Sequence, residues 1–266
     1  MAGVFSKEQL RQMGWDERQL RDALESGVLT RVARGWYAHP TAEAAAVSAV
    51  RAGGRLGCLS GCRTHGLWTP HHREPHIVLG RNTEGRLRLG WHRHHAPLPS
   101  EALFPLADCL AQVIKHHSAE EALTVLESAV NQKKITASDA RLLIGDASVQ
   151  KQRTLKFFDP RAQSGSETKV RLFLQQMRVP VKSQVHIPGV GWVDHLVGNS
   201  YILECDSDEF HRDRGYDYTR DLGAHALGYD SDRLSYAQIH YEWGQTTQYL
   251  VRKIRTRRHL RMPVPI

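Results

Sequence analysis

Two neighbouring segments near residue 200 alternate apolar and polar side chains with a period of two, which is typical of β-strands. Residues 192–197 read Trp-Val-Asp-His-Leu-Val, and residues 201–206 read Tyr-Ile-Leu-Glu-Cys-Asp. Gly198, Asn199 and Ser200 lie between them and predict a short hairpin loop. The pattern therefore restricts this part of the chain to an antiparallel strand pair.

Three carboxylates fall on one face of this expected hairpin. If Val197 and Tyr201 close the loop, Asp194 lies opposite Glu204, and Asp206 lies on the same face as Glu204. Like charges directly opposite each other repel, so an ordinary hairpin avoids this arrangement. A divalent cation removes the conflict, because it turns the carboxylates into ligands. The spacing therefore favours a cation site, with carboxylates on a solvated edge as the alternative.

Two further side chains extend this candidate site. Glu167 follows Ser164 at capping-box spacing where a helix is expected to begin, so a helix cap explains Glu167 nearly as well as a catalytic role does. His211 follows the second strand, and a histidine beside metal-bound carboxylates can relay a proton to or from water or a leaving oxygen. The alternative for His211 is an ordinary loop histidine.

The first forty residues predict helix, helix and hairpin. Capping-box patterns at residues 6–9 and 16–19 begin the two helices, and residues 28–38 predict two short strands joined by a tight turn. Helices followed by a basic hairpin are the parts of a winged helix, with Arg31 and Arg34 placed to meet phosphate. The alternative is a small unit that only docks on its neighbours.

The rest of the chain divides into a scaffold and a C-terminal domain. Residues 41–156 predict a packed α/β scaffold without visible chemistry, and Asp159-Pro160 and Ser164-Gly165 are typical of a linker. We therefore predict an α/β (α+β) fold in three parts, residues 1–40, 41–156 and 157–266.

The C-terminal tail is basic. Apolar residues between 249 and 254 predict an amphipathic helix, and Arg255, Arg257 and Arg258 follow at its end. Contact with phosphate and a merely solvated charged face are both compatible with this run.

The overall charge agrees with a polyanionic partner. The chain has 36 lysine and arginine residues against 28 aspartate and glutamate residues, a formal net charge of +8. Such a field attracts DNA, although a soluble basic protein without a nucleic-acid partner has the same composition. No signal-peptide pattern opens the chain and no apolar run is long enough to span a bilayer, so we expect a cytoplasmic protein without a membrane partner.

The four cysteines and sixteen histidines do not predict a zinc site. Only Cys58 and Cys62 lie close in sequence, and no second pair completes a zinc ribbon or finger. Histidines such as His71, His94 and His116 are scattered through polar or loop-like stretches, so we expect most of them on the surface. We expect the thiols to be free, in a reducing compartment.

The C-terminal segment from Ser164 to about Ile239 resembles the very-short-patch-repair-like branch of the PD-(D/E)XK, restriction-endonuclease-like nucleases. The resemblance implies a helix–sheet–helix core that binds Mg²⁺ or Mn²⁺, with Asp194 as principal ligand. Glu204 and Asp206 stand where the wider family has Glu-x-Lys, and the missing lysine gives His211 more weight. The segments that carry the resemblance are residues 166–168, 193–197, 204–211 and 220–229.

The N-terminal part resembles the winged-helix domain, and the domain after it, of AbiEi-type antitoxins. Residues 5–9, 31–37 and 60–68 carry this similarity. In that setting the domain binds DNA and can repress transcription. Proteins that join these two modules look like bacterial or phage-borne defence or restriction-like factors.

These observations predict a metal-dependent DNA endonuclease in which the carboxylates hold one or two Mg²⁺ ions and His211 acts as general acid or base. Arg220 and the basic tail would hold the phosphate backbone, and the winged helix would position the DNA. The expected partners are DNA and a second copy of the chain. One alternative is a non-catalytic DNA-binding regulator or antitoxin-type protein with an inactive nuclease fold. Another is a toxin with its own antitoxin domain.

Overall fold

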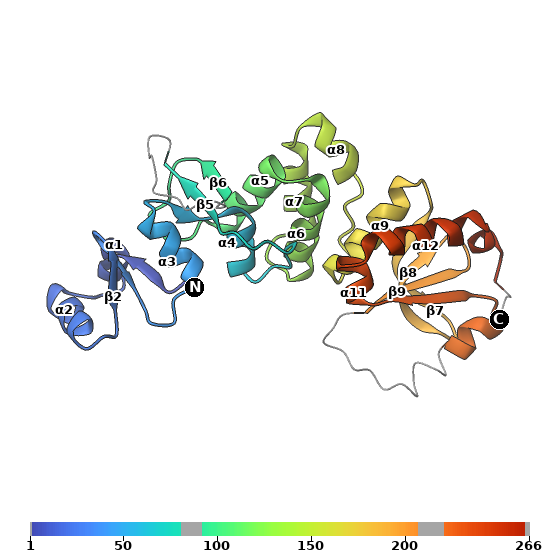
Figure 1. Ribbon diagram of the computed structural model, residues 1–266, viewed down its shortest axis with the longest axis horizontal. Coiled ribbons are helices and arrows are strands. Elements are labelled where there is room, and N and C mark those ends of the chain that lie inside the picture. The colour runs from blue at the N-terminus through green and yellow to red at the C-terminus, as the bar shows by residue number, and fades with distance from the viewer. Residues whose placement is uncertain (1, 81–91, 207–220, 264–266) are drawn as a thin grey trace. The chain divides into compact units, whose positions relative to one another are not determined.

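The computed structural model describes residues 2–80, 92–206 and 221–263 (Figure 1). The chain forms two compact units, one of Met1–Val125 with Arg141–Gln152 and one of Leu126–Ala140 with Arg153–Ile266. Three small sheets and the helices around them confirm the α+β class in the described part of the chain. The three-part division expected from the sequence stays a prediction.

The N-terminal module of the first unit is a three-stranded antiparallel sheet with two helices. The sheet order is β1-β3-β2, so the first strand pairs with the last. Leu10, Leu20, Ala23 and Tyr37 form its buried core. The elements are β1 (Val4–Ser6), α1 (Lys7–Gln12), α2 (Glu17–Glu25), β2 (Thr30–Ala33) and β3 (Trp36–Ala38).

Both predicted capping boxes begin the helices of this module. The side chains of Ser6 and Asp16 accept hydrogen bonds from the backbone N–H of Gln9 and Gln19, and both glutamines bond back to the cap residue. The helix–helix–hairpin order is confirmed. Strand β1 was not predicted, because three residues are too few for a periodic pattern.

The rest of the first unit contains a second three-stranded sheet, of order β4-β5-β6. Strand β5 pairs antiparallel with β4 and parallel with β6, and all four residues of β5 are buried. The elements are α3 (Ala44–Arg51), β4 (Arg55–Leu56), α4 (Cys58–Thr64), β5 (His76–Leu79), β6 (His92–His95), α5 (Leu106–His116), α6 (Ala119–Asn131), α7 (Ala137–Gly145) and α8 (Val149–Leu155), of which α6, α7 and α8 extend across the division between the units.

The second unit is built on a four-stranded sheet of order β10-β9-β8-β7. The register pairs Val197 with Tyr201 across the β8–β9 hairpin, as the sequence predicts. Strand β10 pairs parallel with β9. The elements are α9 (Gly165–Gln176), β7 (Val181–Ile187), β8 (Gly191–Val197), β9 (Tyr201–Cys205), a helical segment at 221–226, β10 (Asp230–Leu234), α11 (Tyr236–His240), α12 (Trp243–Arg255) and a 3₁₀ turn (Arg258–Leu260).

Helices cover this sheet through two apolar clusters. Val170 and Leu174 of α9 pack with Leu203 of β9 and Leu250 of α12. Ile202, which precedes Leu203 in β9, belongs to another cluster that contains Ala224. Neighbouring residues of β9 therefore enter different clusters, as the alternation of a strand buried on both faces requires. None of the helices in the described residues combines the length and the apolar character that a membrane crossing requires.

Candidate functional site

Strands β8 and β9 bring Asp194 and Glu204 together at the position that the hairpin register sets. Oε2 of Glu204 accepts a hydrogen bond from the backbone N–H of Asp194 at 3.1 Å. Oδ2 of Asp194 accepts one from the backbone N–H of Cys205 at 2.9 Å. Each carboxylate is thus fixed by the backbone of the opposite strand, and this arrangement holds both acids at the same end of the hairpin.

Gln184 of β7 links Asp194 to Glu167 of α9. Its side-chain Nε2 donates to Oε2 of Glu167 at 3.0 Å and to Oδ1 of Asp194 at 3.2 Å. Sequence reasoning missed Gln184, since a glutamine in a strand gives no chemical signal. Its backbone φ of 50° lies in the left-handed region, which a residue other than glycine rarely adopts.

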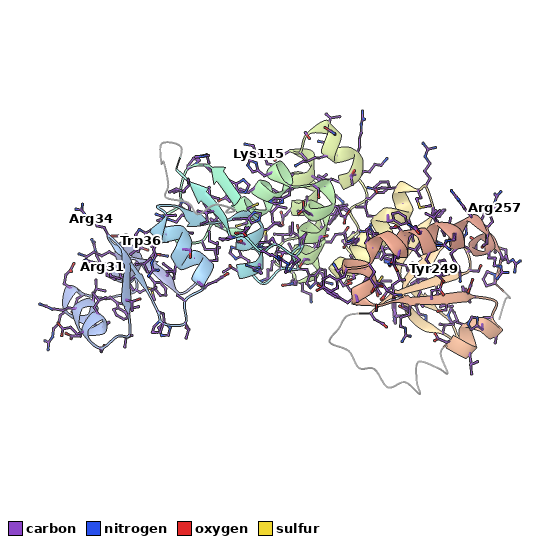
Figure 2. The ribbon with its side chains drawn as sticks, in the orientation of Figure 1. Arg31, Arg34, Trp36, Lys115, Tyr249 and Arg257 are labelled. Carbon is purple, nitrogen blue, oxygen red and sulfur yellow. The ribbon has the colours of Figure 1, made fainter. Side chains whose placement is uncertain are left out.

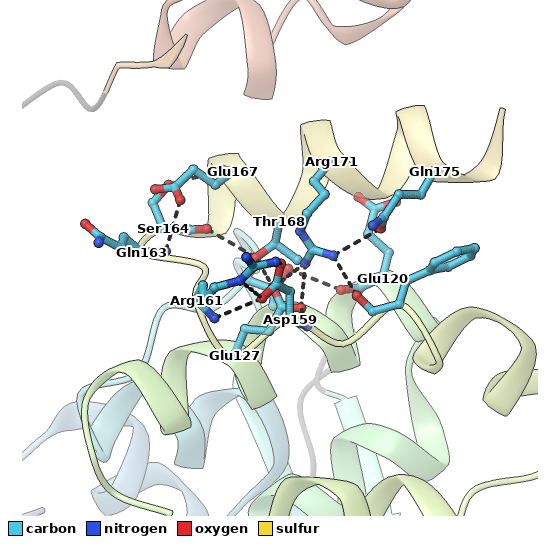
Figure 3. A network of polar contacts seen from close by, with 12 residues as sticks. Glu120, Glu127, Asp159, Arg161, Gln163, Ser164, Glu167, Thr168, Arg171 and Gln175 are labelled. Carbon is cyan, nitrogen blue, oxygen red and sulfur yellow. Dashed lines mark hydrogen bonds and ion pairs between the residues drawn. The ribbon is translucent and has the colours of Figure 1, made fainter. Parts of the chain in front are cut away.

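Glu167 takes part in the N-terminal cap of α9 through its backbone, and its side chain is linked to Asp194 through Gln184. Its N–H donates to Oγ of Ser164 at 3.1 Å, so the predicted helix cap is present (Figure 3). Its Oε2 accepts from the N–H of Gln163 at 3.0 Å as well as from Gln184. Burial, and secondly the charge of Asp194, raise the pKa of Glu167 to about 7. A carboxyl group with this pKa can exchange a proton near neutral pH.

His195 of β8 contacts the first turn of α9. The side chain is fully buried, and its Nε2 lies 3.1 Å from the backbone oxygen of Glu167. Because burial lowers the pKa of His195 to about 4, the ring is neutral at pH 7 and donates Nε2–H to that oxygen. His195 therefore positions Glu167 through its backbone.

The remaining predicted acid, Asp206, is more exposed than the other three. Asp206 is half exposed, and its Oδ2 is 3.7 Å from Nε of Arg233. In the described part of the chain, Glu167, Asp194 and Glu204 do not bring three ligand oxygens within 4.8 Å of one another. His211 and Arg220 lie outside the described residues, so their roles stay predictions.

The basic tail folds back onto the β8–β9 loop. The backbone oxygen of His259 accepts from the N–H of Asn199 at 2.8 Å, and that of Arg258 accepts from Oγ of Ser200 at 3.2 Å. A Cβ on Gly198 would lie 2.4 Å from the His259 oxygen, so glycine is required for this approach. The side chains of Arg255, Arg257 and Arg258 are exposed, with Arg257 labelled in Figure 2.

The N-terminal module also exposes its basic residues. Arg31 lies on β2 and Arg34 in the turn that follows, and both side chains are exposed (Figure 2). Helix α2 buries Leu20 and Ala23 and exposes Arg18 and Arg21. A hairpin and a helix of one small module thus present cationic side chains to solvent.

Comparison with known families decides the character of this module. Residues 2–40 match the family model described as transcriptional regulator, AbiEi antitoxin. The matched segment contains both helices and the hairpin, with Arg31 and Arg34. The predicted resemblance is confirmed for residues 2–40, and that of the domain after it, which includes residues 60–68, stays a prediction. No matched family supports the nuclease resemblance of the C-terminal segment. No curated protein matches the chain.

The structure also gathers residues that the sequence showed only as scattered. Cys58, His76, His94 and His117 each offer one ligand atom, and these atoms all lie within 4.8 Å of one another. His76 and His94 are exceptions to the expectation that most histidines lie on the surface, because they are only 4% and 5% exposed. Their spread over about sixty residues hid the cluster, since the sheet and helices of the scaffold bring them together.

Proposed function

We propose that this protein is a DNA-binding regulator of the AbiEi antitoxin type, in which the N-terminal module contacts DNA. The match of residues 2–40 to the family of transcriptional regulators carries the proposal. The exposed cationic side chains on α2 and on the hairpin support it, because phosphate contacts provide most of the affinity of such modules.

The fold of the N-terminal module suggests how the contacts with DNA are divided between α2 and the hairpin. In helix-turn-helix proteins the second helix enters the major groove. Here that helix is α2, whose buried Leu20 and Ala23 fix it to the core and leave Arg18 and Arg21 facing solvent. Arg34, in the hairpin turn, is placed to contact the phosphate backbone beside the groove.

DNA binding by the full chain tests this proposal. The probes are a random-sequence duplex pool, enriched by rounds of binding, and the DNA that precedes the protein's own coding region. We expect the doubly substituted Arg31→Ala, Arg34→Ala protein to bind more weakly, with a slope of log affinity against log salt smaller by about 2. A matched double variant of the exposed Arg51 and Arg73, both changed to alanine, controls for lost charge. Equal binding by the two double variants would refute the proposed contacts.

A second candidate function is metal-dependent hydrolysis of DNA by the C-terminal unit, in a restriction-like or phage-defence role. The observation in its favour is the link from Glu204 through Asp194 and Gln184 to a glutamate whose pKa is about 7. Carboxylate oxygens are the donors that Mg²⁺ and Mn²⁺ prefer, so Asp194 and Glu204 fit as the residues that would hold the ion.

In this second function the chain's own groups divide the work. A bound Mg²⁺ or Mn²⁺ would supply charge to polarise the phosphate and acidify a water. Glu167, with Gln184 beside it, would accept a proton from that water. His211 would act as general acid or base. Asp206 would be a further ligand of the ion, and Arg220 would hold the phosphate backbone.

Cleavage of supercoiled plasmid with Mg²⁺ or Mn²⁺ tests this function. Asp194→Asn should abolish cleavage, whereas Asp221→Asn, a change in the helical segment of the same unit, should retain it. If the wild-type chain binds DNA but cuts no double- or single-stranded substrate with either ion, the regulator function stands alone.

A further inference from the structure

We propose that Cys58, His76, His94 and His117 bind one zinc ion as a structural site in the first unit. The four ligands come from four places in the fold: the start of α4, the start of β5, strand β6 and the residue after α5. The four ligands all belong to the first unit, and they include neither the exposed arginines of the N-terminal module nor any of the predicted carboxylates. The site therefore stands independently of both proposed functions.

The positions of the ligand atoms suit tetrahedral coordination. All four atoms lie within 4.8 Å of one another. At the usual Zn–N and Zn–S bond lengths, tetrahedral geometry separates ligand atoms by about 3.3–3.6 Å. The ring centroids of the three histidines are 4.9, 6.0 and 6.3 Å apart. Small rotamer changes that bring the ligand atoms about 1 Å closer together would place all four at bonding distance from one zinc ion.

The chemistry of the four ligand side chains favours zinc over Mg²⁺ and Ca²⁺. One thiol and three imidazoles are the ligands of zinc proteins, whereas Mg²⁺ and Ca²⁺ require oxygen donors. Cys58 has no exposed surface, and His76 and His94 are also buried. Four protein ligands in a buried place leave no position for substrate, which is the arrangement of structural zinc sites.

The surroundings hold two of the ligands in place. Nδ1 of His117 lies 3.5 Å from Oε1 of Glu121, and the other ring nitrogen of His117 is buried. The second carboxylate oxygen of Glu121 accepts from the N–H and Oγ of Ser118 at 3.0 and 2.8 Å. A carboxylate that orients one nitrogen of a histidine while the other binds metal is a common feature of zinc sites.

Cys58 is fixed by an unusual backbone. Its φ of 51° lies in the left-handed region, and its N–H donates to Oε1 of Gln112 at 2.8 Å. A Cβ at the preceding Gly57 would lie 2.6 Å from the same oxygen and 2.8 Å from a methyl group of Val78, so a side chain there would displace the Gln112 amide. Strained positions of residues other than glycine concentrate at functional sites, where the surrounding structure maintains them.

Metal analysis of the purified full-length chain tests this proposal. We expect one zinc ion per chain after dialysis, and a Co²⁺-substituted protein with tetrahedral d–d bands and a charge-transfer band from thiolate sulfur to cobalt. Cys58→Ala should lose the charge-transfer band. The matched control, Cys62→Ala, changes another buried cysteine of α4 and should keep it.

Variants of the histidines and of Glu121 refine the test. His94→Gln should lose zinc, whereas His71→Gln, a change at an exposed histidine, should not. Glu121→Gln should weaken zinc binding by about 10- to 100-fold. If Cys58→Ala fails to fold, the charge-transfer band of the wild-type protein, lost with His94→Gln and kept with Cys62→Ala, still supports the assignment. A wild-type chain that retains no zinc and binds neither Zn²⁺ nor Co²⁺ in titration would overturn it, as would loss of the band in Cys62→Ala alone.

Discussion

Arg171 and Glu127 form an ion pair in which neither side chain has any exposed surface. Nη2 of Arg171 lies 2.5 and 2.7 Å from the two oxygens of Glu127 (Figure 3). The same carboxylate accepts from Oγ1 of Thr168 at 2.6 Å and from the N–H of Asp159 at 2.8 Å. Because Arg171 and Thr168 belong to α9, this network anchors the helix that carries Glu167.

Breaking the pair should destabilise the second unit strongly. Arg171→Met leaves the Glu127 carboxylate buried without its cation, which costs about 3–5 kcal/mol in such sites. The double change Glu127→Leu, Arg171→Met should recover much of that loss, because no unpaired charge remains. Urea unfolding measures the effect. Asp22→Asn, which removes the exposed ion pair of Asp22 with Arg18, is the control and should change stability by less than about 1 kcal/mol. A small loss in Arg171→Met would contradict the importance of the pair.

The raised pKa of Glu167 should make stability depend on pH. Burial and the charge of Asp194 raise this pKa from 4.5 to about 7 in the folded chain, so the folded state binds more protons than the unfolded state between these values. Ionised Glu167 therefore lowers stability as pH rises through this window, by at most about 3 kcal/mol. Glu167→Gln should remove this loss. Urea unfolding in EDTA at pH 5 and pH 8 measures it, and parallel profiles for wild type and variant would contradict the shift.

The side chain of Gln184 should reduce the repulsion between the carboxylates of Glu167 and Asp194. Gln184→Leu removes the donor shared by Glu167 and Asp194, so their repulsion should raise the pKa of Glu167 further. Carboxyl ¹³C NMR titration reports this pKa directly. Lys182→Leu removes a nearby exposed charge from the same strand and serves as the control. An unchanged or lower Glu167 pKa in Gln184→Leu would show that the bridge has no such role.

Gly198 should be essential for docking of the tail. Gly198→Ala combines a backbone φ of 62° with a Cβ only 2.4 Å from the backbone oxygen of His259. Gly191→Ala has a φ of 102° and no atom within 4 Å of the added Cβ, so it isolates the backbone strain. Strain of this kind costs about 1–3 kcal/mol. Gly198→Ala should in addition speed amide hydrogen exchange at Asn199 and Ser200. Equal exchange in the two variants would argue against the docking contact.

Local patterns in the sequence determined the hairpin and the caps. Alternation with a period of two assigned Asp194 and Glu204 to one face, and the short loop at 198–200 set the register that brings them level. The caps at Ser6, Asp16 and Ser164 were predictable because their partners lie three residues away. In each case the interacting groups are neighbours in the chain, so spacing alone fixes their geometry.

Only the tertiary structure decided the rest. Gln184 reaches Glu167 because β7 lies beside β8, and nothing in its sequence context indicates a bridging role. The cluster of Cys58 and three histidines, and the pair of Glu127 with Arg171, join residues that are separated by tens of positions. Spacing carries no information over such separations, since it is the packing of sheets and helices that brings these side chains together. The sequence therefore determined the local geometry of the carboxylate hairpin, and the packed fold decided which distant side chains surround it.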